Sequence, residues 1–265
     1  MDEPRLRRRL LLTLASEFHM KSPRTRRWFR RQLLSNIRAV LAAHAPDARL
    51  VDDGRRLLVD ADDIDQSGSA VAKVFGLHRV SAVVETEELS FDHLVEVATE
   101  LGAPLVEGRS FAVRVRRRSQ QPWQSPDLAA AIGERLVPHG RKVDLKNPEV
   151  EVKVEAYGDV AYVVERAWEG PGGLPLGTQG RCLSMLSGGF DSPVATWMLM
   201  RRGSAMDFVH LRLDCSETGH ALLVAHELWR WWGQGTDPRV WLVEFEAVKE
   251  AIAEQVPPRF RQIVL

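Results

Sequence analysis

Cysteine is scarce in this chain: Cys182 and Cys215 are the only two among 265 residues. Two cysteines cannot supply a disulfide framework or a cysteine-only metal site. Long apolar runs are absent too, since no stretch approaches the ~20 residues that a membrane-spanning helix needs. The short apolar stretch behind the basic N-terminus is broken by Thr13 and has no small-residue cleavage site, which argues against a signal peptide. These features predict a cytoplasmic protein with no membrane partner.

The chain also has no net charge, because 36 lysines and arginines balance 36 acidic residues. The charges are nevertheless segregated. Lys21–Arg38 contains seven basic residues and no acid, Arg109–Arg118 contains five arginines and no acid, and Glu85–Glu100 contains six acids and no lysine or arginine. A neutral chain with basic segments suggests a basic surface that faces a polyanion. The alternative is that each segment is only a solvated helix face or strand edge.

The expected elements divide the chain into three blocks, and the first runs to about Glu87. Apolar residues at every fourth position from Phe29 to Leu41 predict an amphipathic helix. A hairpin is expected at Asp53-Gly54, and a second helix over 69–75 should end at Gly76. Strands are expected over 9–16, 48–52, 55–60 and 79–84. The resulting order β-α-β-β-α-β is that of a split-βαβ, ferredoxin-like domain.

The second block, to about Trp168, mixes helices with half-buried strands. A helix is expected over 91–101, capped by Ser90 and ended by Gly102, and another helix should start with Ser125 as its cap. Strands with one buried face are expected where apolar and polar residues alternate, over 109–116, 150–155 and 160–166.

A Gly/Pro-rich segment, 170–177, follows and could be a plain linker. Beyond it, apolar strands alternate with helices. The strands are expected over 181–186, 206–213 and 240–244, and the helices over 193–202 and near 222–232. This alternation predicts a parallel sheet with covered faces.

The strongest chemical signal lies between the first of these strands and its helix, in Ser187-Gly188-Gly189-Phe190-Asp191-Ser192. Adjacent glycines let the backbone approach a ligand, and with two serine hydroxyls and a helix N-terminus they form a nest for an anion. The lysine of a Walker A loop is missing. The segment resembles the SGGxDS loop (PP-loop) of ATP pyrophosphatases, which cleave ATP between the α- and β-phosphates. The alternative is a strand–helix turn that merely uses small residues.

The PP-loop resemblance implies which residues contact ATP. Ligands of open parallel sheets lie beyond the carboxyl ends of the strands, and the resemblance places two residues of each of the first two strands in the adenine and ribose pocket. The expected ATP-binding residues are Met185, Leu186, Ser187, Gly188, Gly189, Phe190, Asp191, Ser192, His210 and Leu211. Asp191 and Ser187 are the expected catalytic residues, with Asp191 either orienting Mg²⁺ or capping the helix. No separate metal site is expected.

The upstream blocks indicate the substrate. Phe111–Arg117 and Val143–Val150 resemble a THUMP domain, which is an RNA-binding module. The remaining matching segments are Arg26–Phe29, Asn36–Ile37, Val74–Leu77 and Gly170–Pro175, the last just ahead of the PP-loop. On these motifs the chain is identified as a member of the tRNA 4-thiouridine synthetases, and the resemblance covers essentially its whole length.

This resemblance implies an α/β and α+β fold in three domains. A ferredoxin-like domain is expected at 1–67, with a last strand to about 87 that packs with the next block. A THUMP domain is expected at 68–169 and a linker at 170–180. An incomplete Rossmann-like PP-loop ATP pyrophosphatase domain should occupy 181–265.

The family activates the uridine oxygen at position eight of tRNA with ATP and Mg²⁺. Sulfur then arrives from a persulfide on an enzyme cysteine that a cysteine desulfurase loads, and some members also supply a small sulfur-carrier protein for thiamine synthesis. The expected partners are therefore tRNA, a desulfurase, a sulfur-carrier protein and a second copy of the chain. Phosphate contacts and shape reading should dominate tRNA binding. The expected RNA-binding residues are Lys21, Arg26, Arg27, Arg30, Arg114, Arg116, Arg117, Lys142 and Lys146.

The sequence departs from the family pattern in two places. It ends at Leu265, where the family continues, and the family's persulfide cysteine matches neither Cys182, which should be buried and inert, nor Cys215. The chain alone is therefore not expected to make 4-thiouridine. The usual Lys-Gly after the first strand reads His19-Met20-Lys21-Ser22 here.

Three other functions compete with this one. An RNA-binding protein with an incomplete ATP site is the main alternative. A small-molecule PP-loop amide synthetase would not need a THUMP-like block. A THUMP-linked methyltransferase would need a glycine-rich cofactor loop such as GxGxG, which does not occur.

Overall fold

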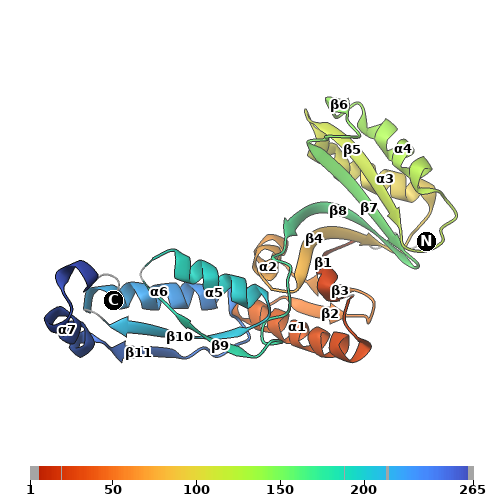
Figure 1. Cartoon of the computed structure of the whole chain (residues 1–265). Helices are drawn as coiled ribbons and strands as arrows, with labels where there is room; N and C mark the ends of the chain where they lie inside the picture. The colour runs from red at the N-terminus through yellow and green to blue at the C-terminus, as the bar shows by residue number, and fades with distance from the viewer. Residues whose placement is uncertain (1–5, 19, 188, 213–214, 262–265) are drawn as a thin grey trace. The chain divides into compact units, whose positions relative to one another are not determined.

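The computed structural model describes residues 6–18, 20–187, 189–212 and 215–261, and the side chains of residues 215–217 lie outside this description. The contacts within the chain divide it into two compact units, which are coloured by residue number in Figure 1. The first comprises Met1–Thr13, Asp47–Gly68 and Arg79–Glu169, and the second comprises Leu14–Pro46, Ser69–His78 and Gly170–Leu265. Each unit is thus built from three separate stretches of sequence.

The first unit is built on an eight-stranded sheet with the order β2-β3-β1-β4-β8-β7-β5-β6. Its strands are β1 (Arg7–Leu14), β2 (Arg49–Asp52), β3 (Leu57–Asp60), β4 (Leu77–Thr86), β5 (Ser110–Arg117), β6 (Lys142–Val143), β7 (Val150–Tyr157) and β8 (Val160–Glu169). The expected hairpin joins β2 to β3, where Gly54 adopts a φ of +84° and its N–H donates to the Asp52 carboxylate at 2.8 Å. The chain order β1-α1-β2-β3-α2-β4 confirms the ferredoxin-like pattern.

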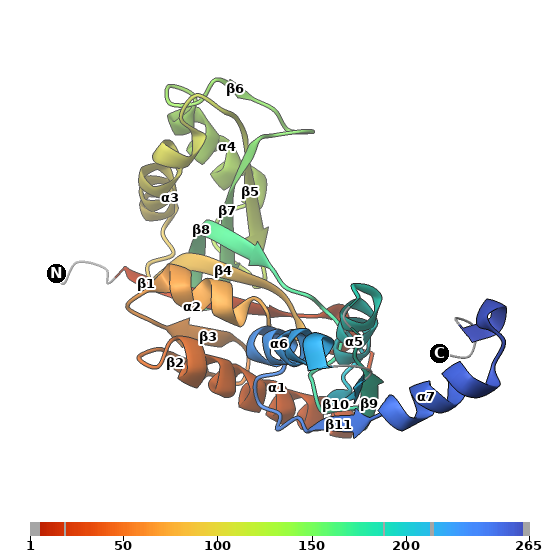
Figure 2. The same cartoon turned by 90° about the vertical axis from the view of Figure 1, so that its left-hand side faces the viewer.

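Two helices cover one face of the C-terminal part of this sheet, α3 (Phe91–Val106) and α4 (Ser125–Leu136), as Figure 2 shows. Their apolar stripes meet the inward side chains of β5, β7 and β8 in one buried core. Leu94, Leu128 and Phe111 are almost completely buried there. Burial of this size contributes about 1.5–3 kcal/mol for each large apolar side chain, so this core strongly stabilises the part of the sheet formed by β5, β7 and β8.

The positions expected for two helices, over 69–75 and 91–101, were wrong. The helix expected over 69–75 lies earlier, as α2 (Ile64–Val71), because the Asp63 carboxylate accepts a hydrogen bond from the N–H of Gln66 at 2.8 Å and caps it. The helix from Phe91 does not end at Gly102 but continues to Val106. A Cβ at Gly102 would lie 3.2 Å from Leu136 and 3.3 Å from Val152, so this glycine allows close packing and does not end the helix.

Of the two expected serine caps, one lies at its expected position and the other was wrong. Ser90 is the N-cap residue of α3, although its hydroxyl donates to Glu88 at 2.8 Å and makes no capping hydrogen bond. Ser125 is already the first residue of α4, since the cap position is taken by Gln124. Short polar side chains before a helix can bond to several nearby groups, so sequence alone does not decide which bond forms.

The second unit combines an N-terminal helix with a small parallel sheet. The helix α1 (Pro23–His44) begins after Ser22, whose hydroxyl accepts from the N–H of Thr25 at 3.3 Å, and a short 3₁₀ helix, η1 (Ser16–Phe18), precedes it. The sheet order is β11-β10-β9, with all pairs parallel as expected. Its elements are β9 (Arg181–Met185), α5 (Asp191–Arg201), β10 (Ala205–Arg212), α6 (Cys215–Trp232), β11 (Val240–Glu244), α7 (Glu246–Gln255) and η2 (Pro258–Phe260).

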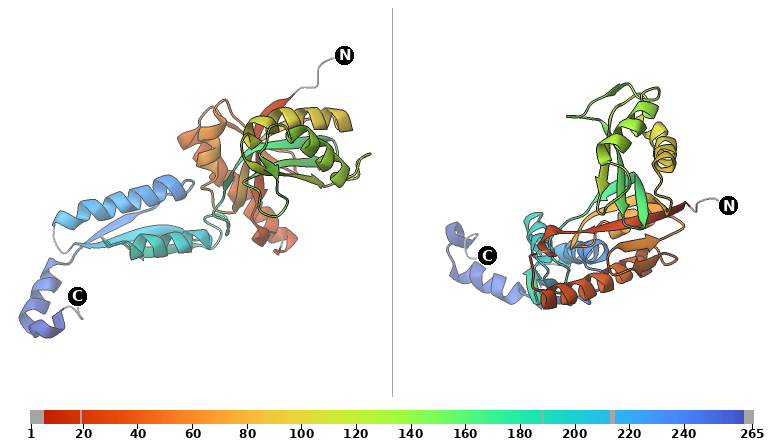
Figure 3. Two further views of the ribbon diagram at one scale, coloured as in Figure 1. Left: turned by 90° about the horizontal axis from the view of Figure 1, so that it is seen from above. Right: turned by 90° about the vertical axis from the view of Figure 1, so that its right-hand side faces the viewer.

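The helices α5 and α6 lie along the same side of the three strands (Figures 1 and 3). Met206 and Phe208 of β10 are buried there with Met200 of α5 and Leu228 of α6. On the other side of the sheet, Leu183 and Met185 are 61% and 59% exposed. Within the described residues, one face of β9 and β10 is therefore covered and the other is open, and β11 is exposed on both faces, whereas the sequence predicted two covered faces. None of the helices in the described ranges has both the length and the apolar character needed to cross a bilayer.

Candidate nucleotide site and basic pocket

The expected PP-loop lies at the carboxyl end of the parallel sheet. β9 ends at Met185 and α5 begins at Asp191, so the loop fills the turn between them. The N–H of Leu186 donates to the carbonyl of Val209 on β10 at 2.8 Å, which places the start of the loop beside the end of the second strand. His210 and Leu211 lie in the next two positions of β10. The structure thus brings together Met185, Leu186, His210 and Leu211, which the sequence placed in one site.

A chain of hydroxyl groups closes the loop onto the first turn of α5. The N–H of Ser187 donates to the Ser192 hydroxyl at 3.2 Å, and the two serine hydroxyls lie 3.3 Å apart. Thr196 is fully buried below them. Its hydroxyl donates to the carbonyl of Ser192 at 2.7 Å and lies 2.6 Å from the hydroxyl of Ser184. The loop hydroxyls of Ser187 and Ser192 thus contact each other, and the backbone of Ser192 is tied to the buried hydroxyl of Thr196.

The mouth of this loop is open. Phe190 is 91% exposed, and Asp191 is exposed as the first residue of α5. A Cβ at Gly189 would meet only the Ser187 hydroxyl, at 3.6 Å, and Gly189 does not have a positive φ. The backbone therefore does not require glycine at position 189, and a glycine there leaves room for the close approach of a ligand. Gly188 lies outside the described residues.

The loop suits a phosphate group by its chemistry. The first N–H groups of a helix have no partner within the helix, and their partial positive charge attracts anions. Here they lie at the start of α5 next to two hydroxyl donors. Mg²⁺ commonly binds through one or two carboxylates plus substrate phosphates. Asp191 could supply one such carboxylate, and in the described part of the chain no three acidic, histidine or cysteine side chains gather into a metal cluster.

His210 is the most buried ionisable group of the site, at 4% exposure. Its Nδ1 atom lies 2.9 Å from the carbonyl oxygen of Leu186, and its Nε2 atom is buried without a hydrogen-bond partner among the described residues. Cys182 is half-buried in β9 against the apolar core of the unit, whereas the sequence predicted a buried thiol. The side chain of Cys215, at the start of α6, lies outside the described residues, as does His19.

The Gly/Pro-rich segment before β9 is packed between the elements of the second unit. We call residues 170–180 the strap. Its backbone bonds to residues 76–78 on one side and to the end of α5 on the other: the N–H of Gly172 donates to Leu77 at 2.9 Å, and the N–H of Leu174 donates to Arg201 at 3.0 Å. The Asn36 amide of α1 donates to the carbonyl of Leu176 at 3.1 Å. The strap therefore links α1 to the helix that follows the PP-loop.

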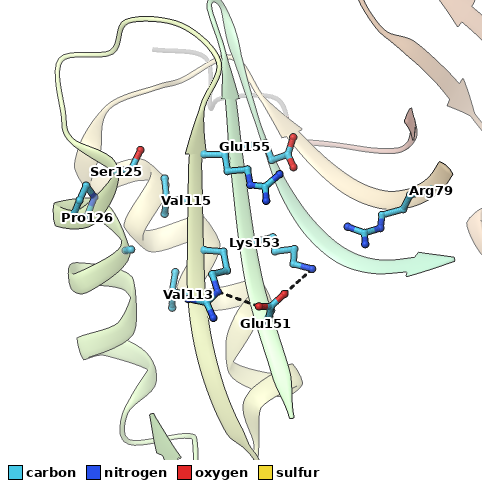
Figure 4. A pocket seen from close by; sticks show the side chains of 11 residues that line it. Arg79, Val113, Val115, Ser125, Pro126, Glu151, Lys153 and Glu155 are labelled. Carbon is cyan, nitrogen blue, oxygen red and sulfur yellow. Dashed lines mark hydrogen bonds and ion pairs between the residues drawn. The ribbon is translucent and has the colours of Figure 1, made fainter. Parts of the chain in front are cut away.

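A basic pocket of about 520 Å³ lies in the first unit, beside β5 and the start of α4 (Figure 4). It is lined by Arg79, Val113, Arg114, Val115, Arg116, Ser125, Pro126, Ala129, Glu151, Lys153 and Glu155. The strand β6 pairs only with Ser110 and Phe111, so beyond these residues the outer edge of β5 is open next to α4. The pocket combines cationic side chains, an open backbone edge and a helix N-terminus.

The arginines of β5 differ in how far the protein itself occupies them. Arg114 donates to Glu151 at 3.0 Å and to the carbonyl of Leu145 at 2.7 Å. Arg117 donates to the carbonyl of Trp123 and to Gln124, both at 2.8 Å. Arg116 is exposed, and in the described residues no ion pair or hydrogen bond of its side chain is found. Of the three, Arg116 is the most available to an anionic ligand.

Two cations of this pocket were missed at the sequence level, Arg79 and Lys153. Lys153 forms an ion pair of 2.8 Å with Glu151, which Arg114 also contacts (Figure 4). The alternation of β7 places Lys153 on a polar face of the strand. Assigning Lys153 to this pocket also requires knowing that β7 pairs with β5. The parallel register sets Arg114 opposite Lys153, and pairing of distant strands is not readable from periodicity.

The remaining expected RNA-binding residues fall in two groups. Lys142 and Lys146 are exposed in the first unit, where Lys142 pairs with Asp144 at 3.1 Å. Lys21, Arg26 and Arg27 are exposed and Arg30 is half-buried, just before or within the first turns of α1 in the second unit. Each group is basic within its own unit.

Glu149 anchors the segment that leads into β7. Its carboxylate accepts from the N–H of Ser110 at 2.6 Å and from the Ser110 hydroxyl at 2.8 Å, and it pairs with Arg141 at 2.7 Å. These hydrogen bonds, the backbone one first, lower the pKa of Glu149. The carboxylate is therefore held in its charged form at the edge of β5.

Comparisons with known proteins agree with this arrangement. The ThiI ferredoxin-like domain family matches residues 11–81, the THUMP domain family matches residues 88–164, and the family described as thiamine biosynthesis protein (ThiI) matches residues 177–265. The crystal structure of PH1313 from Pyrococcus horikoshii has a TM-score of 0.74 at 25% identity, covering 94% of this chain and 82% of that one. A 4-thiouridine synthetase–RNA complex with bound ATP has a TM-score of 0.76 at 23% identity, covering 97% of this chain and 67% of that one.

Curated relatives are similar over almost the whole chain. The tRNA sulfurtransferase of Desulfurococcus amylolyticus is 39% identical over 262 residues, and the probable tRNA sulfurtransferase of Sulfurisphaera tokodaii is 35% identical over 244 residues. They cover 96% and 92% of this chain, which spans 53% and 64% of their lengths. A probable tRNA sulfurtransferase of Saccharolobus islandicus is 33% identical over 258 residues, with 97% of this chain and 68% of the relative covered. Together with the three domain matches in their expected order, this shows that the chain belongs to the ThiI-type tRNA sulfurtransferase family.

Proposed function

We propose that this chain carries the tRNA-binding and ATP-binding parts of an enzyme that transfers sulfur to the uridine at position eight of tRNA and forms 4-thiouridine. The observation that carries the proposal is the PP-loop itself, with two serine hydroxyls 3.3 Å apart at the start of α5 and an exposed Asp191 beside them. The structurally similar 4-thiouridine synthetase complex holds both RNA and ATP, which supports the same pair of ligands here.

In this proposal ATP activates the uridine oxygen as an adenylate, and pyrophosphate leaves. The N–H groups at the start of α5 and the hydroxyls of Ser187 and Ser192 bind the phosphates, because charge-assisted hydrogen bonds to an oxyanion are stronger than neutral ones. Asp191 holds Mg²⁺ together with the phosphates. Met185, Leu186 and Leu211 form the side of the site toward adenine and ribose, and His210 supports this side through its buried contact with the carbonyl of Leu186.

The tRNA is held by the two basic groups. Arg116 and the neighbouring cations of the basic pocket contact phosphates, while Lys21, Arg26, Arg27 and Arg30 do so from the second unit. Such contacts orient an RNA without reading its sequence, which suits a reaction directed at one fixed position of many tRNAs. Each phosphate neutralised releases counterions, so the affinity should fall with salt.

The sulfur comes from a persulfide that a cysteine desulfurase loads. Cys182 is half-buried within β9 and is not a candidate for this role, since the attacking or accepting group must be an accessible thiolate. The curated relatives are longer than this chain, and the proposal assigns the persulfide to no cysteine of the described residues. Supply of sulfur to a carrier protein for thiamine synthesis and assembly with a second copy are further parts of the proposal.

A second candidate function is tRNA binding without a complete catalytic apparatus. It is favoured by the open face of the three-stranded sheet, where Leu183, Met185 and Trp241 are more than half exposed. Extensive exposed apolar surface weakens a domain or marks a place where further polypeptide packs. The two candidates differ in whether the chain itself turns over ATP.

The deciding experiment measures pyrophosphate release from ATP and Mg²⁺ in the presence and absence of tRNA. Wild-type protein should release pyrophosphate in a tRNA-dependent way, and Asp191→Ala should lose this activity while keeping its tRNA affinity. Asp127→Ala is the matched control, because Asp127 is also an acid in the first turn of a helix but lies in α4. If wild-type protein binds tRNA and releases no pyrophosphate, the second function holds. If Asp191→Ala is as active as wild type, the assigned role of the PP-loop is wrong.

A further inference from the structure

The side chain of His210 has a defined tautomer. A carbonyl oxygen can only accept a hydrogen bond, so the 2.9 Å contact to Leu186 requires that Nδ1 carries the hydrogen and donates. In the neutral ring Nε2 then has a lone pair and no hydrogen. That atom is buried and has no partner in the described part of the chain, so a ligand cannot reach it without a rearrangement. The ring therefore acts through Nδ1 on the backbone of Leu186.

The bond to Leu186 controls the first peptide of the PP-loop. The carbonyl of Leu186 and the N–H of Ser187 belong to one planar peptide unit, so fixing the direction of the carbonyl also fixes the direction of that N–H. The N–H of Leu186 is already held by Val209 at 2.8 Å. The N–H of Ser187 donates to the Ser192 hydroxyl at 3.2 Å, which is the start of the hydroxyl chain.

Beyond this peptide the contacts that shape the loop are weaker. The N–H of Gly189 reaches the Ser187 hydroxyl at 3.4 Å, and the Ser192 hydroxyl reaches the Ser187 carbonyl at 3.5 Å, both among exposed residues. Hydrogen bonds near the upper distance limit hold geometry less firmly than short, buried ones. The buried bond from His210 at 2.9 Å is therefore, with the bond from Leu186 to Val209 at 2.8 Å, one of two firm constraints on the loop from outside α5.

We infer that His210 is a positioning residue for the triphosphate of ATP. It orients the Leu186–Ser187 peptide so that the PP-loop is shaped before the phosphates arrive, and its ring does not touch the nucleotide. A preformed loop loses less conformational freedom on binding, which raises affinity without a new contact. This inference rests on the proposed function, since it needs ATP in this loop.

Three substitutions separate the roles of the two ring nitrogens. In His210→Asn the side-chain amide places a donor close to the position of Nδ1, in His210→Gln the donor moves outward toward the position of Nε2, and in His210→Leu there is none. The measurements are the dissociation constant for ATP, the KM and kcat of tRNA-dependent pyrophosphate release, the affinity for tRNA, and the urea concentration at half unfolding.

We expect His210→Leu and His210→Gln to bind ATP about tenfold more weakly, because a buried carbonyl is left without its donor. His210→Asn should stay within about twofold of wild type, and tRNA affinity should be unchanged in all three. In the pyrophosphate-release assay the loss should appear mainly as a higher KM for ATP, with little change in kcat. If His210→Leu does not fold, the comparison of Asn with Gln still decides.

The inference is overturned if the Asn variant binds ATP as weakly as the Gln variant while both are equally stable, because the ring or Nε2 would then be the active part. It is also overturned if every folded variant keeps wild-type affinity. If wild-type protein itself binds no ATP, the proposed function has failed and the inference fails with it. Loss of ATP binding only in the His210 variants leaves the proposed function intact.

Discussion

Replacing Gly173 by alanine is the most direct test of how the strap is built. Gly173 is buried with a φ of +74°, and an added Cβ would lie 2.1 Å from the carbonyl oxygen of Arg201 at the end of α5. Gly180, at the other end of the strap, has a similar φ of +78° but nothing within 4 Å of an added Cβ. The two positions share the backbone strain and differ only in the space around them.

The expected magnitudes follow from this difference. A left-handed backbone conformation costs an alanine about 1–2 kcal/mol, and Gly180→Ala should lose only that much stability. In Gly173→Ala the strap or α5 must move by about 1 Å, which adds about 1–3 kcal/mol of overpacking. The hydrogen bond from Leu174 to Arg201, now 3.0 Å, would be stretched at a further cost of about 1 kcal/mol. Gly173→Ala should therefore be less stable than Gly180→Ala by about 2–4 kcal/mol.

The assay is urea unfolding followed by tryptophan fluorescence. Trp197 and Trp232 make an edge-to-face contact with ring centroids 5.5 Å apart in the second unit, so they report on the part that the strap holds. With a urea slope of about 1–3 kcal/mol per molar, the midpoints of the two variants should differ by about 1 M or more. Equal midpoints would mean that the strap is not packed against α5, and the reasoning from the clash would be wrong.

Three further outcomes are expected. Arg116→Ala should weaken tRNA binding and reduce the slope of log K against log salt by about 0.7–0.9. The control is Arg135→Ala, since Arg135 is an exposed residue of α4 outside the basic pocket, and this variant should change neither quantity. Equal losses of tRNA affinity in the two variants would contradict the pocket as an RNA site. Because the pKa of Glu149 is lowered in the folded protein, Glu149→Gln should unfold at a lower temperature than wild type at pH 7. This difference in melting temperature should shrink as the pH falls below about 4, where the wild-type carboxylate becomes protonated. A difference that stays constant down to about pH 2 would refute the role of the charge. Thr196→Val should cost about 1–2 kcal/mol of stability and also weaken ATP binding. The control Thr178→Val removes a similar buried hydroxyl bond in the strap and should affect stability alone. Equal ATP affinities of the two variants would show that the hydroxyl chain does not shape the loop.

The sequence predicted those parts of the structure that depend on local patterns. The parallel sheet, the hairpin at Gly54 and the position of the PP-loop all followed from periodicity and turn chemistry, and the structure has them. The position of α2 was missed because an aspartate cap outweighed the apolar run after it. Gly102 was misread as a helix end, since only the packed neighbours show why a side chain does not fit there.

The candidate site shows the same limit. Its residues could be chosen from a motif, but the roles of some of them depend on distant partners. The tautomer of His210 follows from a carbonyl 24 positions away in sequence, and Lys153 enters the basic pocket only through the parallel pairing of β5 and β7. The strap resembled a linker in composition, and its burial depends on α1 and α5 together. Long-range pairing of this kind leaves no local trace in a single sequence.

The assembly of the second unit from separate stretches has a consequence for synthesis on the ribosome. The helix α1 is finished early, yet the Asn36 amide finds its partner 140 residues later, and the ring of His44 waits for Arg230, 186 residues later. His44 also stacks on Trp231 with the rings 5.4 Å apart. At translation rates of about 5–20 residues per second, α1 must wait roughly 10–40 s for these neighbours. During that time Leu176, Arg230 and Trp231 are not yet synthesised, so the side chains of Asn36 and His44 lack these partners on the nascent chain.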